Sequence, residues 1–379
     1  MLNYCIANAA HSLRFCAAIL LIWAGAADAA PVAYVTKQGS NNVSITDIAA
    51  RTIVASVVVG TNPSGVAVNR AGTRAYVANR GSNDVSVIDI ATHTVIATVA
   101  VGALPRGVAV NPVGTRVYVT NVNSDNVSVI DTATHTVIAT LAVGAAPYDV
   151  TINSSGTRAY VANRDSNSVS VIDTATHTMV ATVAVGTFPF GVAVNPAGTR
   201  LYVTNIISNN VSVIDTATHT VIATVAVGAS PSGVALNPAG TRAYVANASS
   251  NNVSVIDTAT HVVVATVWVG ATPSCVVVNP AGTRAYVANN GSNNVSVIDI
   301  ATRAVIATVA MGGSPLAFGH FIGRPLAPRC SAALCLTGND NDSDSACYTA
   351  AGATCSRSKR FVNRPDPFPH TWPGLCVSA

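Results

Sequence analysis

A single pattern of residues recurs seven times along this chain, at a constant interval. Each copy has a tyrosine followed by Val, then by Ala or Thr, and then by Asn, which the first copy replaces with Lys. The tyrosines are Tyr34, Tyr76, Tyr118, Tyr160, Tyr202, Tyr244 and Tyr286, so each step equals that from position 34 to position 76. Repeats of 40–45 residues with four strands each are typical of β-propeller blades. The spacing therefore predicts a ring of repeated sheets.

Each repeat contains four short runs that are rich in β-branched residues. In one repeat they cover residues 107–111, 115–121, 126–131 and 136–143, and each is bounded by Gly, Pro, Asn or Asp. Helices are not expected, because the chain has 16 acidic residues that are all Asp and only two Lys among its 20 basic residues. A membrane barrel needs strands of about 9–11 residues and aromatic girdles. These runs are shorter, and aromatic residues make up 5% of the chain.

The two ends of the array indicate that the ring closes. The array begins at the second strand of a repeat, residues 33–36, with no first strand before it. Residues 314–321, which contain Phe318, align with the first strand of the preceding repeat and follow the seventh outer strand. We therefore predict an all-β, seven-bladed β-propeller of four-stranded antiparallel blades, closed by a C-terminal inner strand that joins the N-terminal strands.

The repeated words also resemble a known family. YVTN or YVAN followed by SNNVSVIDTAT, AVG and P-x-GVAVNP resemble the YVTN-repeat β-propellers, which include surface-layer-like and YncE-like proteins. The resemblance covers residues 32–322 and implies the propeller fold. It constrains function weakly, because propellers host many unrelated activities.

The segments that flank the array differ from it in composition. Residues 1–29 follow the order of a signal peptide, with an apolar run at 15–26 and cleavage expected before Ala30. We predict an exported chain, periplasmic, cell-surface or secreted, with no membrane span after cleavage; a retained N-terminal anchor is the alternative. Residues 30–323 would form the propeller and 324–379 a Cys-rich tail stapled by disulfides or disordered. The candidate disulfide cysteines are Cys275, Cys330, Cys335, Cys347, Cys355 and Cys376.

Oppositely charged residues recur in step with the blades, and pairing the second and third strands places them opposite each other. We interpret them as structural pairs that hold the hairpins in register. The pairs are Arg74 with Asp89, Arg116 with Asp131, Arg158 with Asp173, Arg200 with Asp215, Arg242 with Asp257, and Arg284 with Asp299. Histidines also recur at one turn position, but copies in separate blades are too far apart to share a metal ion. We expect no metal site and no cofactor.

The loops on one face vary between copies, whereas those on the other face are nearly constant. Binding residues tend to lie on variable loops carried by a rigid scaffold. The sequence therefore predicts a binding face in these loops, with drift in exposed loops as the alternative. Its candidate residues are Arg80, Arg106, Tyr148, Asp149, Arg164 and Phe190.

These candidates favour binding over catalysis. The face has no His and no Glu, so general acid–base residues are scarce, and no catalytic residue is assigned. We predict a non-catalytic envelope or surface protein that binds a protein or polysaccharide at this face. A lactonase- or lyase-like propeller enzyme is the alternative. Single-stranded nucleic acid, as for a YncE-like protein, ranks lower because the few arginines are balanced by nearby aspartates.

Overall fold

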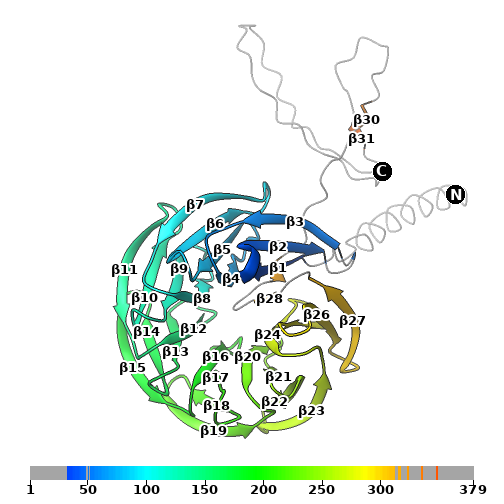
Figure 1. The fold of residues 1–379 in the computed structure, drawn as a ribbon. Helices are drawn as coiled ribbons and strands as arrows, with labels where there is room; N and C mark the ends of the chain where they lie inside the picture. Colours follow the sequence, from blue (N-terminus) through cyan, green and yellow to red (C-terminus); the bar gives the residue numbers. More distant parts are fainter. Residues whose placement is uncertain are drawn as a thin grey trace, which may run out of the picture. The chain divides into compact units, whose positions relative to one another are not determined.

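The computed structural model shows a ring of β-sheets around a central axis (Figure 1). It describes residues 32–47, 50 and 52–311, and the backbone of four two-residue strands at 315–316, 322–323, 334–335 and 347–348. The chain divides into two units, residues 1–325 and 326–379, and the ring belongs to the first. The predicted signal segment lies outside the described residues, and the predicted domain boundaries stay predictions. No helix among the described residues is long and apolar enough to cross a membrane.

Seven antiparallel sheets form the blades, and each strand has a fixed place from the axis outward. The inner strands are β4 (Pro63–Val68), β8 (Pro105–Val110), β12 (Pro147–Ile152), β16 (Pro189–Val194), β20 (Pro231–Leu236) and β24 (Pro273–Val278), with β28 (Pro315–Leu316) and β29 (Ile322–Gly323) in the first blade. The second strands are β1 (Val32–Lys37), β5 (Arg74–Asn79), β9 (Arg116–Asn121), β13 (Arg158–Asn163), β17 (Arg200–Asn205), β21 (Arg242–Asn247) and β25 (Arg284–Asn289).

The outer half of each blade follows the same order. The third strands are β2 (Asn42–Asp47), β6 (Asp84–Asp89), β10 (Asn126–Asp131), β14 (Ser168–Asp173), β18 (Asn210–Asp215), β22 (Asn252–Asp257) and β26 (Asn294–Asp299). The outermost are β3 (Thr52–Val58), β7 (Thr94–Ala100), β11 (Thr136–Ala142), β15 (Thr178–Ala184), β19 (Thr220–Ala226), β23 (Val262–Trp268) and β27 (Ala304–Ala310). A 3₁₀ turn, η1 (Gln38–Ser40), follows β1, and β30 (Leu334–Cys335) pairs with β31 (Cys347–Tyr348) in the second unit. Blade 1 contains β1–β3 with β28 and β29, blade 2 contains β4–β7, and blades 3 to 7 follow in order.

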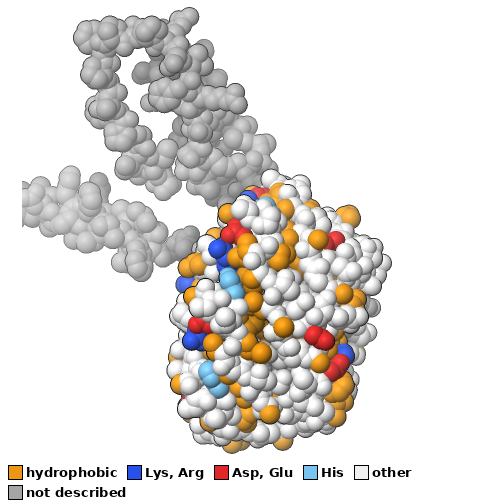
Figure 2. All heavy atoms as spheres, turned by 90° about the vertical axis from the view of Figure 1, so that its left-hand side faces the viewer, with side chains coloured by type: hydrophobic (Ala, Val, Ile, Leu, Met, Phe, Trp, Pro, Cys, Tyr) orange, Lys and Arg blue, Asp and Glu red, His pale blue; other side chains and the backbone are white. Residues whose placement is uncertain are grey.

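The hydrophobic core lies between neighbouring blades. Tyr76 and Val87 of blade 2 belong to one buried cluster with Val117 and Ile130 of blade 3, and the following interfaces repeat this arrangement. The second and third strands are therefore buried on both faces, which explains their nearly continuous apolar runs. The outer strands alternate, and Ile96 and Ile138 are 44% and 45% exposed. Figure 2 looks onto this perimeter and shows hydrophobic side chains spread between groups of charged ones.

Both ends of the array meet in blade 1. Strand β28 pairs with β1 at Thr36 and Lys37, and β29 pairs with β1 at Val32 and Ala33 (Figure 1). A second link joins blades 1 and 7, because Thr46 Oγ1 lies 3.8 Å from Sδ of the fully buried Met311. The seven-bladed architecture predicted from the repeat is confirmed. Phe318, which we expected in the closing strand, lies outside the described residues.

A buried asparagine ends the second strand in blades 2 to 7, a feature that the sequence analysis missed. Asn121 is fully buried, and its Nδ2 donates to Asn126 Oδ1 at 2.7 Å and to Ser128 Oγ at 2.9 Å. A Cβ atom at Gly102 would lie 2.7 Å from the Asn121 carboxamide carbon, which explains the Val-Gly word before each loop. The recurring spacing of seven positions between Asn and Ser was the available signal.

Candidate functional site

The repeated Arg and Asp residues are paired across each blade. In the register of β9 and β10, Arg116 lies opposite Asp131, and the Nη1 to Oδ2 distance is 2.6 Å. Equivalent ion pairs occur at the other five predicted positions. The second carboxylate oxygen of Asp131 accepts a hydrogen bond from Thr134 N at 2.9 Å, and this bond is the main reason that the pKa of Asp131 lies below its usual value. Each aspartate thus links the hairpin of the second and third strands to the turn that follows the third strand.

The recurring histidines lie in the turns between the third and outer strands. His93, His135 and their counterparts have φ angles near 55°. In four of these turns the histidine N–H donates to the carbonyl of the Asp four positions earlier, as His135 N does to Asp131 O at 2.9 Å. Within the part of the chain that the structure describes, no three His, Cys, Asp or Glu residues gather into a possible metal site. The backbone hydrogen bonds place these histidines in the turns of separate blades.

Side chains of the variable face fasten successive blades to each other. The loop between β15 and β16 is held on one side by Asn167 Oδ1, which accepts from Phe188 N at 2.9 Å, and on the other by Ser208 Oγ, which accepts from Thr187 N at 2.7 Å. The same bonds recur in other blades, where Asn209 Oδ1 accepts from Ser230 N and Ser250 Oγ accepts from Ala229 N. These loops are consequently fixed in place at the mouth of the ring.

Five side chains from three neighbouring blades contact each other at this mouth. We call them the aromatic–arginine cluster: Arg106, Tyr148, Arg164, Phe188 and Phe190. The Arg106 guanidinium carbon lies 3.8 Å from the centroid of the Tyr148 ring and 5.1 Å from that of Phe190. Arg164 approaches the same Tyr148 ring at 5.0 Å and Phe188 at 5.5 Å. Tyr148 and Phe190 are 4.5 Å apart between centroids and tilted by 48°. These are cation–π and aromatic contacts.

The cluster is positively charged. Burial, with smaller contributions from the positive charges of Arg80 and Arg164, lowers the pKa of Arg106 to about 10, so the guanidinium stays protonated at neutral pH. Arg80 Nε is buried and has no hydrogen-bond partner among the described residues. Arg164 pairs with Asp165 at 2.6 and 2.9 Å, and this hydrogen bonding raises its pKa. The cluster thus places positive charge beside partly exposed aromatic rings.

The predicted position of three candidates within exposed loops was wrong. Arg106, Tyr148 and Phe190 lie in the inner strands β8, β12 and β16, which begin at proline rather than two residues later. Proline tolerates the first position of an edge strand because it has no N–H to pair. Arg106 is only 7% exposed, so it supports the aromatic rings rather than offering an accessible side chain. Phe188, which was not predicted, is 38% exposed; comparison of the residues before each proline could have found it.

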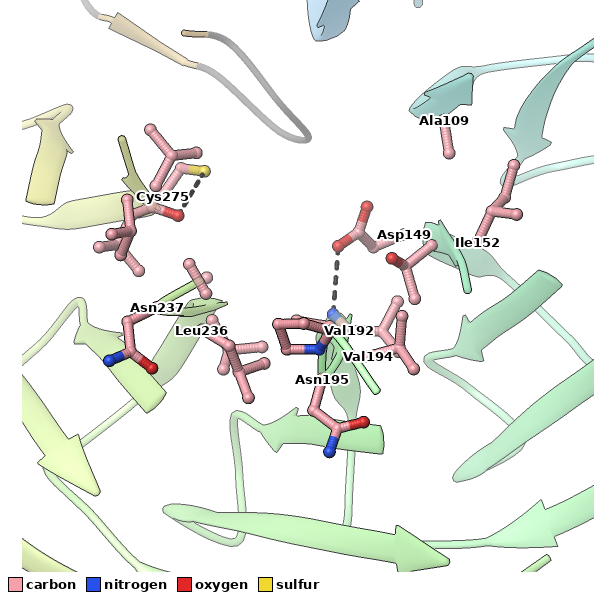
Figure 3. Close-up of a pocket in the computed structure, with 18 of the residues that line it drawn as sticks. Ala109, Asp149, Ile152, Val192, Val194, Asn195, Leu236, Asn237 and Cys275 are labelled. Carbon is pink, nitrogen blue, oxygen red and sulfur yellow. Dashed lines mark hydrogen bonds between the residues drawn. The ribbon is translucent and has the colours of Figure 1, made fainter. Parts of the chain in front are cut away.

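Asp149 also departs from the prediction, because it does not join the cluster at the loop face. It lines a cavity of about 430 Å³ on the axis, together with Val108, Val192, Val234 and Cys275. Figure 3 shows the carboxyl group pointing into this space, with Cys275 on another side of it. Asp149 Oδ1 accepts from Val150 N at 2.9 Å and Oδ2 from Val192 N at 3.1 Å. Burial outweighs these bonds and raises the pKa of Asp149 to about 6.

The cysteine predictions remain open. Cys275 is buried in β24, forms no disulfide with another described residue, and has its Sγ 3.8 Å from Val276 O. The side chains of the tail cysteines lie outside the described residues. The backbone register of β30 and β31 places Cys335 opposite Cys347.

Solved structures with the same fold come from proteins of different kinds. Hydrazine synthase of Kuenenia stuttgartiensis matches with a TM-score of 0.65 and 25% identity over 69% of this chain and 90% of that one. A functionally unknown protein of Desulfotomaculum acetoxidans matches with a TM-score of 0.69 and 17% identity, over 78% of this chain and 99% of that one. The dihydro-heme d1 dehydrogenase NirN matches with a TM-score of 0.55 and 17% identity, over 74% of this chain and 63% of that one. These similarities show the fold, which is shared by unrelated functions.

A comparison with curated proteins found no match. The family model of the YncE-like β-propellers matches residues 18–158 and 151–242, which together make up more than half of the chain. The YVTN resemblance and the seven blades agree with this match. The chain therefore belongs to the YncE-like β-propeller family.

Proposed function

We propose that this propeller is an exported, non-catalytic binding protein of the cell envelope or surface. Its partner, a protein or a polysaccharide that presents flat apolar groups beside acidic ones, docks on the face that carries the aromatic–arginine cluster.

The observation that carries the proposal is the gathering of departures from the repeat. Position by position, Arg106, Tyr148 and Phe190 stand where three other blades have Ser64, Ser232 and Ser274. Unselected changes would be scattered around seven blades. These lie in three successive blades and contact each other. A rigid aromatic surface with arginine is the composition typical of binding hot spots.

The chemistry of the cluster does not favour catalysis. The carboxyl group beside it, Asp165, is paired with Arg164, and that hydrogen bond holds its pKa below the usual value. A general base needs a pKa near the working pH and a free path to its proton. Among the described residues of this face, the lactonase- or lyase-like alternative therefore has no carboxyl group with a raised pKa to act as the base. Among the described residues, Asp149 alone has a carboxyl pKa raised to about 6, and it lines the axial cavity instead.

The binding test uses substitutions that copy other blades. Arg164→Ala and Phe188→Ser introduce the residues found at the same positions in other repeats, Ala248 and Ser230, so the fold should tolerate them. Pull-down from envelope extract with the mature chain should capture a partner that the double variant loses by about tenfold or more. Trp268→Ala is the control, since Trp268 is 71% exposed on the outer strand β23, away from the cluster, and Ala226 is its counterpart.

Two further assays separate the alternatives. Retention of the partner by the double variant contradicts the proposed face. A mobility shift with single-stranded DNA that persists at moderate salt would favour nucleic acid, and lactone turnover abolished by these substitutions would favour an enzyme. Export is tested by N-terminal sequencing of the chain recovered from the envelope, with Ala30 expected as the first residue. A start at Met1 in the membrane fraction would favour a retained anchor.

A further inference from the structure

The axial cavity differs in chemistry from the aromatic–arginine cluster. It is lined by β8, β12, β16, β20 and β24 and by the turns that follow these strands, and most of its lining side chains are Val, Ala, Ile, Leu or Pro. Asp149 is the one ionisable carboxyl among its lining residues. Ligand sites of small molecules are commonly apolar cavities of about 300–1,000 Å³ with a few placed polar groups. The volume of about 430 Å³ lies within that range.

The position of Asp149 marks it as a departure from the repeat. Four other blades have glycine there, at Gly65, Gly107, Gly191 and Gly233, because the inner strands approach closely. A Cβ at Gly191, for example, would lie 2.3 Å from Ser232 O. Placing a carboxyl group at a glycine position near the axis costs desolvation free energy. No ion pair of the described residues offsets this cost, although Arg106 is close enough to act on the carboxyl electrostatically.

We propose that this cavity binds a small apolar molecule that carries one protonated amine, with the amine held by the Asp149 carboxylate. The carboxylate can accept such a bond because each of its oxygens accepts one backbone hydrogen bond and carries a further lone pair. A cation supplies the positive counter-charge that the partly buried carboxylate lacks, and the valine and alanine surface contacts the apolar body of the ligand. An anionic ligand would be repelled by the negative charge of the carboxylate.

The test compares two probes of the same shape. The purified chain is titrated calorimetrically at pH 7.5 with 1-adamantylamine and with 1-adamantanol. The amine should bind at least about tenfold more tightly than the alcohol, because only the protonated amine forms a hydrogen bond with the carboxylate in which both groups are charged. In Asp149→Gly, which introduces the residue of the neighbouring blades, the preference should vanish. Equal affinities, no binding of the amine, or an unchanged preference in Asp149→Gly would overturn the proposal.

A second measurement needs no variant and so does not depend on how Asp149→Gly folds. Amine binding to the wild-type chain should weaken as pH falls from 7.5 to 5, whereas binding of the alcohol should stay constant. Arg106 on β8 is the charged group that acts on Asp149; Arg158 on β13 is paired with Asp173, and β16 carries no charged residue. Parallel pH profiles for the amine and the alcohol would overturn the assignment.

Discussion

At the scale of single residues, a repeated blade places the same polar group in the same buried setting many times. Asn121 and its counterparts are fully buried and donate to two side chains each. A buried donor or acceptor that loses its partner costs the full desolvation free energy of the group. The asparagines therefore hold the second and third strands together from within the blade, whereas the Arg–Asp pairs do so at its partly exposed edge.

Substituting one buried asparagine should lower the stability of the whole ring. Asn121→Ala leaves Asn126 Oδ1 and Ser128 Oγ without their donor, so we expect a loss of about 1–3 kcal/mol in the free energy of unfolding. Urea denaturation followed by circular dichroism measures it. Asn123→Ala, at an exposed position two residues later, is the control and should change little. Equal effects of the two substitutions would contradict this role.

Asp149 should make the protein less stable at neutral pH than at mildly acidic pH. Burial raises its pKa from 3.8 to about 6, so above pH 6 the folded chain carries a carboxylate that is costly to bury, and below about pH 4 the cost is absent. Asp149→Gly should therefore raise the free energy of unfolding at pH 7.5 by up to about 3 kcal/mol. The greater flexibility of glycine in the unfolded chain reduces this gain. This difference from wild type should shrink between pH 7 and 4; a constant difference in urea titrations would refute it.

At the scale of strands and loops, side chains from the preceding blade fix the variable face. Asn167 holds the loop that carries Phe188, and Asn209 holds the equivalent loop at Ser230. The recurring Ser-Asn-Asn words thus act between blades, which a comparison of strand patterns alone does not predict. The aromatic–arginine cluster is supported by these bonds and by the inner strands.

A pair of identical substitutions separates stability from partner docking. Asn167→Gly keeps the left-handed backbone, with φ of 51°, but removes the acceptor for Phe188 N. Asn209→Gly does the same for Ser230 N. Both should cost about 1 kcal/mol. Only Asn167→Gly should speed amide exchange at Phe188 and weaken capture of the partner; equal weakening by both variants would contradict the placement of the site.

At the scale of the whole molecule, the ring depends on pairing between the two ends of the array. Four residue pairs join β28 and β29 to β1, and Thr46 contacts Met311 across the same junction. Residues from the first and the last repeat therefore share one sheet. Such a closure removes the exposed edges that an open array would present.

Truncation tests the closure directly. A chain that ends at residue 325 lacks the second unit and should keep the stability of the full chain. A chain that ends at residue 311 also loses β28 and β29, and at about 1 kcal/mol per lost backbone hydrogen bond its unfolding midpoint in urea should drop clearly. Equal midpoints for the two truncated chains would show that the closing strands contribute nothing.

Much of the fold was predictable because the repeat encodes it locally. The constant period, the runs around each tyrosine and the opposed Arg and Asp residues led to seven blades with the observed register of second and third strands. The start of the inner strands was misplaced, since proline followed by Ser, Arg or Tyr resembles a loop. Departures from the repeat predict Arg106, Tyr148, Arg164 and Phe190, which lie in the aromatic–arginine cluster, but they do not predict Phe188.

The sequence by itself determined the blade, because strand length, turn residues and buried faces are set by neighbours within one repeat. Only the tertiary structure decided what the departures do. Arg106, Tyr148 and Phe190 belong to three successive repeats and contact each other because adjacent inner strands converge at the axis. The same convergence directs Asp149 into the cavity rather than onto the face. Side-chain direction near an axis depends on the packing of successive blades, which no single repeat contains.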